Sequence, residues 1–326
     1  MRRWEHAMQA VYHEQYGPPE VLRYGEQPDP TPGPDEVLIR VRATSLNRVD
    51  IYRRAGTHGY AGPLPAILGS DIAGEVVAVG AAVAAFRPGE RVVASGNGAY
   101  AQLAVAAATS TYPLPAGCTF DEGAAIPTAG RTAYDAVMNR AAVRAGEDVL
   151  VIAAASGVGS YALQLAKFSG ARVIATAGIS EKLERATALG ADCVINHYTE
   201  DIADRVLEFT GGVGVDVIIE QVGTPVWLAC MKSLKPFGRL VTFGITAGHR
   251  FDLHLGRVSQ LGLQIMGLGL PSEAERRETM RRLLRLVEQG RVRPVIDARY
   301  PLAQAAEAHR RMEQSAFFGK IVLLPE

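Results

Sequence analysis

The sequence predicts a two-domain α/β protein, with a mainly β N-terminal domain and a doubly wound parallel-sheet domain. The chain has 326 residues, and a domain commonly has about 150. Short strands separated by glycine and proline fill the first third, whereas strands and helices alternate from about Gly146. The first pattern is typical of an irregular antiparallel barrel or sandwich, and the second of a parallel sheet with helices on both faces.

The composition excludes several classes of partner. Lys plus Arg and Asp plus Glu each number 34, so the formal net charge is zero, and we expect no nucleic-acid partner. The longest apolar run, residues 149–155, is shorter than the roughly 20 residues that cross a bilayer, so we expect no membrane-spanning helix. Cys118, Cys193 and Cys230 are widely spaced and no apolar signal segment follows the basic N-terminus, which predicts a cytoplasmic, reducing compartment.

In the first third, four apolar runs are predicted to be strands, at residues 37–41, 72–79, 91–94 and 100–106. The second part predicts six strands, at residues 149–155, 172–177, 193–195, 215–222, 239–243 and 263–268. Helical spacing of apolar residues predicts the intervening helices, at residues 158–168, 181–189, 202–209 and 226–234. A long amphipathic helix over residues 272–289 follows, and the chain closes with a helix and a strand at residues 320–324.

The turn after the first of the six strands is the most informative segment. A dinucleotide-binding fingerprint has glycine at three positions, which here hold Ala154, Ser156 and Gly159. Small residues still let the backbone approach a diphosphate at the start of a helix, although any tight strand-to-helix turn favours small residues. We therefore predict a dinucleotide site whose contacts here are Ala155, Ser156, Gly157, Val158 and Gly159.

The tip of the second strand bears on the choice of cofactor. NAD sites place an acidic residue about 20 residues after the turn, against the ribose hydroxyls, whereas the tip here is Gly178. Ser180 and Lys182 are instead suited to a 2′-phosphate, with His197 and Tyr198 on the same sheet edge. NADPH is therefore favoured, although Glu181 offers an acid for NAD and Lys182 is alternatively a solvated first-turn residue.

Six stretches of the chain are informative when taken together: GPPEVL (17–22), LNRVD (46–50), GSDIAG (69–74), TAY (132–134), GAD (190–192) and GVGVD (212–216). With them the chain resembles the medium-chain dehydrogenase/reductase superfamily, and within it the zinc-independent quinone oxidoreductase (zeta-crystallin-like) branch. The resemblance implies a GroES-like substrate domain over residues 1–129 and a Rossmann NADPH-binding domain over residues 130–269. A C-terminal segment, residues 270–326, would return to the substrate domain. If Met8 is the family start, the first seven residues are an extension.

Departures from the zinc-dependent relatives indicate the chemistry. Those enzymes have a cysteine ligand where this chain has Asn47, and Gly-His-Glu where it has Gly69, Ser70 and Asp71. A catalytic zinc needs three such ligands, so the resemblance implies an enzyme without metal. An acceptor that delocalises the incoming negative charge, a quinone or a conjugated enone, is then easier to reduce than a simple carbonyl.

The remaining site residues are implied by the resemblance. Tyr52 and Asn47 are the candidate catalytic residues, as hydrogen-bond donors to the substrate oxygen, although Tyr52 is equally interpreted as a half-buried aromatic. Further cofactor contacts are Thr132, Phe243, Gly244, Ile245, Gly267, Leu268, Gly319 and Lys320. Simpler interpretations are a helix cap for Thr132, turns at the glycines and a surface turn at residues 318–320; Arg48, Arg53 and Arg54 are expected to be solvated.

The sequence thus predicts an NADPH-dependent quinone or enone reductase that is a homodimer or homotetramer, paired through edge strands such as residues 263–268. An enoyl-thioester or alkenal reductase on the same scaffold is the first alternative. A non-catalytic NADPH-binding protein is the second.

Overall fold

The computed structural model describes residues 7–325, so nearly all of the proposed N-terminal extension lies outside the described residues. The chain divides into two compact units. Unit 1 runs up to Ala129 and resumes at Pro294, and unit 2 covers Gly130–Arg293. Within residues 7–325, no helix is both long enough and apolar enough to cross a bilayer.

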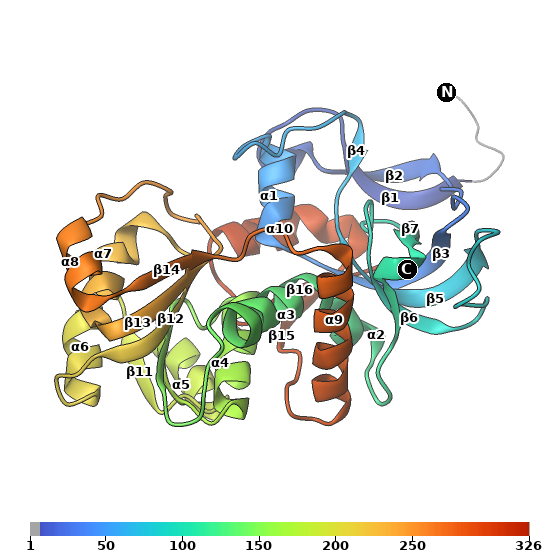
Figure 1. Cartoon of the computed structure of the whole chain (residues 1–326). Helices are drawn as coiled ribbons and strands as arrows, with labels where there is room; N and C mark the ends of the chain where they lie inside the picture. Colours follow the sequence, from blue (N-terminus) through green and yellow to red (C-terminus); the bar gives the residue numbers. More distant parts are fainter. Residues whose placement is uncertain (1–6, 326) are drawn as a thin grey trace. The chain divides into compact units, whose positions relative to one another are not determined.

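Unit 1 is mainly β (Figure 1). Its larger sheet has the strand order β15-β16-β3-β5-β6-β8, and β7 pairs with β3 outside this path. The strands are β3 (Glu36–Ser45), β5 (Asp71–Val79), β6 (Arg91–Ser95), β7 (Leu103–Ala107), β8 (Thr111–Pro113), β15 (Ile296–Pro301) and β16 (Lys320–Leu324). A smaller sheet contains β1 (Ala7–His13), β2 (Arg23–Pro28) and β4 (Ala66–Ile67).

The helices of unit 1 are short. They are η1 (Pro19–Val21), α1 (Arg48–Ala55), η2 (Ala108–Ser110), α2 (Phe120–Ala124), η4 (Leu302–Gln304) and α10 (Ala305–Glu313). Helix α1 starts where the Asn47 N–H donates to Asp50 Oδ2, at 2.8 Å, and it ends at Gly56, which adopts the left-handed conformation (φ 68°). Both ends of α1 are thus set by its own sequence.

Unit 2 contains one parallel six-stranded sheet in the order β11-β10-β9-β12-β13-β14 (Figure 1). This is the predicted doubly wound sheet, so the predicted fold class is confirmed. The strands are β9 (Asp148–Val151), β10 (Arg172–Ala177), β11 (Cys193–Asn196), β12 (Val215–Glu220), β13 (Leu234–Thr242) and β14 (Gln264–Gly267). The helices are α3 (Pro127–Tyr134), which begins in unit 1, η3 (Asp135–Arg140), α4 (Gly157–Phe168), α5 (Ser180–Ala188), α6 (Ile202–Phe209), α7 (Thr224–Ser233), α8 (Leu255–Leu261) and α9 (Glu273–Glu288).

Helix α9 belongs to unit 2, whereas the sequence placed residues 270–293 with the returning C-terminal segment. On α9, Thr279 Oγ1 donates to Asp135 Oδ1 at 2.8 Å, and the buried Leu283 packs against Gly130. Because of these contacts with the start of unit 2, the boundary lies at Pro294 rather than at residue 270. The amphipathic pattern of the sequence predicts the helix but does not indicate which unit covers the apolar face of that helix.

The first strand of unit 2 is shorter than predicted. Strand β9 ends at Val151, and residues 152–155 form a turn in which Ala153 has φ 53°. The apolar run continues past the strand because this turn is itself packed in the interior, where Ile152 is 2% exposed and Ala154 fully buried. Continuous apolar residues therefore indicate burial here rather than strand length.

Candidate functional site

The turn between β9 and α4 forms a tight cradle at a helix N-terminus. Ser156 is the N-cap of α4, and its Oγ accepts a hydrogen bond from the Gly159 N–H at 2.9 Å. A Cβ atom on Gly159 would lie only 2.3 Å from Ala153 O, so glycine is required there. Ser156, Gly157 and Val158 are only half-buried, which leaves the start of the helix accessible to an anion.

The structure brings together three of the five residues predicted at the tip of β10. A Cβ on Gly178 would lie 2.4 Å from the Tyr198 ring and 3.2 Å from His197 Nε2. Desolvation lowers the pKa of His197, and the positive charge of Lys182 lowers it further. Ser180 is exposed at the first position of α5.

The ends of β12 and β13 form the next part of this sheet edge. Glu220 is fully buried, where its carboxylate accepts hydrogen bonds from the N–H groups of Val222 and Gly223. Desolvation outweighs these bonds and raises the pKa of Glu220. The predicted contacts Gly244 and Ile245 line a cavity of about 290 Å³ beside this edge.

The loop after β14 is fixed by an arginine. Arg140 donates from Nε and Nη2 to Leu268 O, at 3.0 and 2.7 Å. Thr132 lies in the interior of α3 rather than at its start, so the alternative interpretation of Thr132 as a helix cap is wrong.

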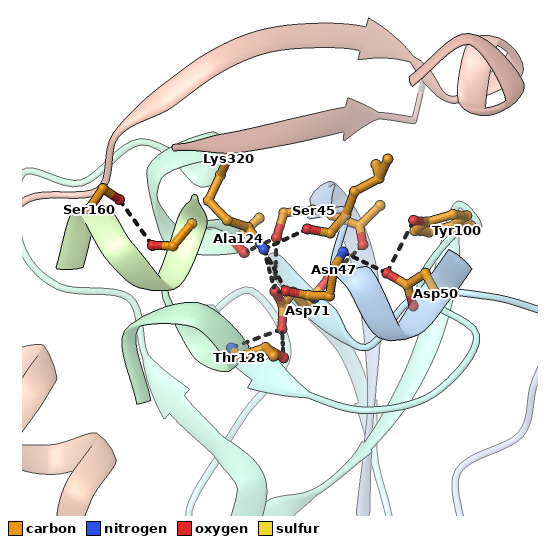
Figure 2. Close-up of polar contacts among 12 residues, drawn as sticks. Ser45, Asn47, Asp50, Asp71, Tyr100, Ala124, Thr128, Ser160 and Lys320 are labelled. Atoms are coloured by element: carbon orange, nitrogen blue, oxygen red, sulfur yellow. Dashed lines mark hydrogen bonds and ion pairs between the residues drawn. The ribbon is translucent and has the colours of Figure 1, made fainter. Parts of the chain in front are cut away.

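A buried ionic cluster lies in unit 1 (Figure 2). Lys320 is 2% exposed, and its Nζ donates to Asn47 Oδ1 at 2.6 Å, to Leu46 O at 2.7 Å and to Asp71 Oδ2 at 3.4 Å. Desolvation lowers the pKa of the Lys320 ammonium, whereas the carboxylates of Asp71 and Asp50 raise it. Lys320 therefore does not lie in a surface turn, and its three N–H donors are directed to groups of unit 1 rather than to a cofactor.

Asp71 is the centre of this cluster. Its fully buried carboxylate accepts hydrogen bonds from Ser45 Oγ and Asn47 Nδ2, both at 2.8 Å. Thr128 donates to the other carboxylate oxygen from its N–H and its hydroxyl, at 3.1 and 2.6 Å. The amide of Asn47 is thus engaged at both ends, and its visible role is to hold Asp71 and Lys320 in place.

Tyr52 is half-buried on α1, one and a half turns after Asn47. Its ring centroid lies 4.3 Å from that of His58 and 6.0 Å from that of Tyr60. The ring therefore lies beside two aromatic neighbours.

A second buried network joins α1 to α10. Arg54 is 2% exposed, and it donates to Gly17 O at 3.0 Å, to His309 Nδ1 at 3.1 Å and to the Glu313 carboxylate at 2.5 Å. The expectation that Arg54 is solvated is therefore wrong. Its carboxylate and imidazole partners come from a helix more than 250 residues later in the chain, which no local pattern predicts.

Asp50 connects the two networks. Its Oδ2 accepts from the Asn47 N–H at 2.8 Å and from Tyr100 Oη at 3.3 Å (Figure 2). Burial raises the pKa of Asp50 to about 6, despite the Asn47 N–H. This carboxyl group therefore keeps its proton to a higher pH than an exposed aspartate does.

Comparisons with known proteins identify the family. A family model described as "Zinc-binding dehydrogenase" matches residues 157–289, and one described as "Alcohol dehydrogenase GroES-like domain" matches residues 33–116. The quinone oxidoreductase of Pseudomonas aeruginosa is 39% identical over 317 residues, which are 95% of this chain and 97% of that protein. The chain belongs to the quinone oxidoreductase branch of the medium-chain dehydrogenase/reductase superfamily.

Two solved structures are also similar. The Escherichia coli quinone oxidoreductase complexed with NADPH has a TM-score of 0.89 and 32% identity, covering 97% of this chain and 100% of that one. A structure described as an NAD-dependent alcohol dehydrogenase has a TM-score of 0.91 and 37% identity, with coverage of 97% and 99%. The parallel-sheet and GroES-like architecture is therefore shared across members with different cofactors.

The zinc named in the family description does not fit the residues of this quinone oxidoreductase family member. Asn47 and Asp71, at the positions compared above with zinc ligands, are bound to the Lys320 ammonium, whose positive charge opposes a second cation. In the described part of the chain, no group of three or more His, Cys, Asp or Glu side chains is arranged to hold a metal ion.

Two groups of site residues were missed by the sequence interpretation. The Arg54 and His309 network has no sequence signal, because its members are far apart in the chain. Gln221 did have a sequence signal, because it directly follows β12 at the carboxyl edge of the sheet, where ligands bind in doubly wound folds. Its Nε2 donates to Ser156 Oγ at 2.6 Å.

Proposed function

We propose that this protein is an NADPH-dependent reductase of quinones or conjugated enones that transfers hydride without zinc. Family membership supports this proposal, together with the names of the relatives. The observation that carries it is the group at the tip of β10, where Gly178 stands in place of an acid and Lys182 lies in the first turn of the helix that follows. An ammonium group at this position favours a 2′-phosphate over a free ribose hydroxyl.

The described residues fit NADPH. The N–H groups of Gly157 and Val158, at the start of α4, would hold the diphosphate, and the half-buried Ser156 lies beside them. Lys182 and Ser180 would hold the 2′-phosphate, and the exposed ring of Tyr198 offers a surface for the adenine. The absence of an acidic side chain at residue 178 argues against the NAD preference of the structurally similar alcohol dehydrogenase.

The chemistry follows from the acceptor. Reduced nicotinamide supplies a hydride, and a quinone or enone that takes it spreads the negative charge to a conjugated oxygen. The protein then needs to hold the acceptor and offer a hydrogen-bond donor to that oxygen. We assign this donor role to the Tyr52 hydroxyl.

Asn47 supports this arrangement as a positioning residue. Its amide links the buried ammonium of Lys320 to the carboxylate of Asp71, and its N–H starts α1, the helix that carries Tyr52. In this cluster the charges of Lys320 and Asp71 neutralise each other, and Asn47 fixes the start of α1. The cytoplasmic location and the homodimer or homotetramer are further proposals, resting on the cysteine pattern and on the β14 edge.

The proposal is tested by following NADPH oxidation with a panel of acceptors: benzoquinone, phenanthrenequinone, an alkenal and a crotonyl thioester. Saturation with quinones supports quinone reductase activity. Turnover confined to the alkenal or the thioester would identify the alternative double-bond reductase. Tight NADPH binding without turnover of any acceptor would contradict an enzymatic role.

The Tyr52 assignment has its own test. Tyr52→Phe should lower kcat by about tenfold to hundredfold, because one donor to the developing oxyanion is lost. Tyr60→Phe removes a different hydroxyl and keeps the ring beside Tyr52, so it is the matched control. Equal kcat values for wild type and Tyr52→Phe would remove Tyr52 from the mechanism.

A further inference from the structure

The side chain of Gln221 bridges two loops at the carboxyl edge of the parallel sheet. It follows β12, and its amide nitrogen donates to Ser156 Oγ in the turn after β9, at 2.6 Å. The two residues are 65 positions apart in the chain. This contact has no role in the sequence fingerprint of dinucleotide sites, which describes only the turn.

The hydrogen bonds of Ser156 determine the direction of its hydroxyl hydrogen. A hydroxyl oxygen has two lone pairs and one hydrogen. One lone pair accepts from the Gly159 N–H at 2.9 Å, and the other accepts from Gln221 Nε2. With both acceptor sites filled from within the protein, the hydrogen points away from these two donors.

Neighbouring groups hold the main chain of Gln221 in place. Its main-chain carbonyl oxygen accepts from Thr246 Oγ1 at 3.2 Å, and a Cβ on Gly244 would lie 2.3 Å from that oxygen. The next two N–H groups in the chain are held by the buried carboxylate of Glu220. The amide thus extends from a loop that is fixed on both sides.

We propose that Gln221 is a positioning residue that makes the Ser156 hydroxyl an obligate hydrogen-bond donor to the diphosphate of the bound cofactor. This inference rests on the proposed function, because it takes the diphosphate of NADPH as the ligand of the turn. An anionic oxygen accepts hydrogen bonds and donates none, so a hydroxyl already oriented as a donor needs no reorientation on binding.

The reversed orientation of the Gln221 amide predicts the opposite change in NADPH affinity. If the amide oxygen faced Ser156, the hydroxyl would donate to Gln221 and be lost to the ligand. Removing the amide would then free the hydroxyl and tighten NADPH binding. The direction of the change in affinity therefore distinguishes the two arrangements.

The experiment is a double-mutant cycle on the dissociation constant for NADPH, measured by calorimetry or by quenching of protein fluorescence. Gln221→Met keeps the length of the side chain and removes its amide, and should weaken binding about three- to tenfold. Ser156→Gly removes the hydroxyl and introduces glycine, which is tolerated at an N-cap; it should weaken NADPH binding about tenfold. In the Ser156→Gly background, Gln221→Met should have no further effect, because its partner is gone.

Three results would overturn the inference: unchanged binding by Gln221→Met, tighter binding by Gln221→Met, or equal weakening in both backgrounds. Adenosine 2′-monophosphate, which lacks a diphosphate, should bind wild type and Gln221→Met equally, and a parallel loss would show a general disturbance instead. Circular dichroism checks folding. If Gln221→Met does not fold, Gln221→Glu serves as the second variant. It replaces the donor with acceptors and should also weaken NADPH binding.

The outcomes separate this inference from the proposed function. A wild-type protein that does not bind NADPH would overturn both. A wild-type protein that binds NADPH and shows additive effects in the cycle would overturn only the role of Gln221.

Discussion

The neutral, buried His309 gives unit 1 a defined sensitivity to acid. A guanidinium group only donates hydrogen bonds, so the contact from Arg54 makes His309 Nδ1 an acceptor. The hydrogen of the neutral ring is then on Nε2, which donates to Tyr100 Oη at 3.2 Å. Tyr100 in turn donates to Asp50. The hydrogen bond from Arg54 requires an uncharged imidazole, because a protonated ring has no acceptor at Nδ1.

The size of the effect follows from the difference in pKa between the folded and unfolded states. Desolvation, the charge of Arg54 and His13 lower the pKa of His309 from 6.5 to about 3. The unfolded state therefore binds more protons than the folded state between these values, and the free energy of unfolding falls as the pH decreases below about 6.5. Proton linkage for one such group gives a loss of about 2 kcal/mol between about pH 7.5 and about pH 5.

His309→Gln removes this titration and keeps a polar side chain. At about pH 7.5 the variant should be less stable by roughly 1–3 kcal/mol, because buried hydrogen bonds are disturbed. At about pH 5 the difference from wild type should shrink by about 2 kcal/mol. Hydrogen exchange of α10 peptides, monitored during urea unfolding, measures this difference in stability for unit 1 specifically. This is needed because the two units need not unfold together.

The comparison has an internal control. The raised pKa of Asp50 acts in the opposite direction, making unfolding easier as the pH rises towards about 6. Its contribution is present in both proteins, so the difference between them isolates His309. His249→Gln, which removes an exposed imidazole from unit 2, should leave α10 exchange as in wild type. Parallel pH dependence of wild type and His309→Gln would refute the neutral, buried imidazole.

Three further predictions concern unit 2. Gly159→Ala places a methyl group 2.3 Å from Ala153 O; it should destabilise the protein by about 1–3 kcal/mol and weaken NADPH binding, and an unchanged melting temperature would contradict this close approach. Lys182→Ala should lower NADPH affinity roughly tenfold while leaving NADH affinity unchanged, because only NADPH carries the 2′-phosphate; equal losses for both cofactors would place Lys182 elsewhere. Met266→Lys puts a charge on the half-buried face of edge strand β14 and should reduce the mass measured by sedimentation, whereas an unchanged oligomer would exclude pairing through this edge.

Much of unit 2 was predictable because its signals are local. The strand at residues 172–177 and the helix at residues 202–209 have the predicted bounds. The small residues Ser156 and Gly159 were also expected from the spacing of the turn, and the structure places them at the N-cap of α4 and at the close contact with Ala153. The hydrogen bond from Gln221 was not predictable, because the side chain on the facing loop depends on how the two strands are aligned.

Unit 1 shows where local patterns stop being informative. The strand at residues 320–324 was predicted with its observed bounds, yet the burial of its first residue, Lys320, was not. A lysine after a phenylalanine and a glycine is typical of an exposed turn, and charged residues are rarely fully buried without a partner. Here the partners are Asn47 and Asp71, which the sequence singled out as departures from a zinc site, with Asn47 also a candidate donor to the substrate, but not as partners of a lysine.

The sequence by itself determined the order of strands and helices in unit 2 and the small residues of its phosphate-binding turn. These depend on periodicity and steric limits that act over a few neighbouring residues. The tertiary structure decided which charges are buried and what neutralises them. Lys320 and Asn47 are 273 positions apart, and only the pairing of β16 with β3 brings the ammonium to the amide and to the carboxylate of Asp71. Burying a charge is too costly without such partners, so the complete fold, rather than any segment of it, determines the electrostatics of unit 1.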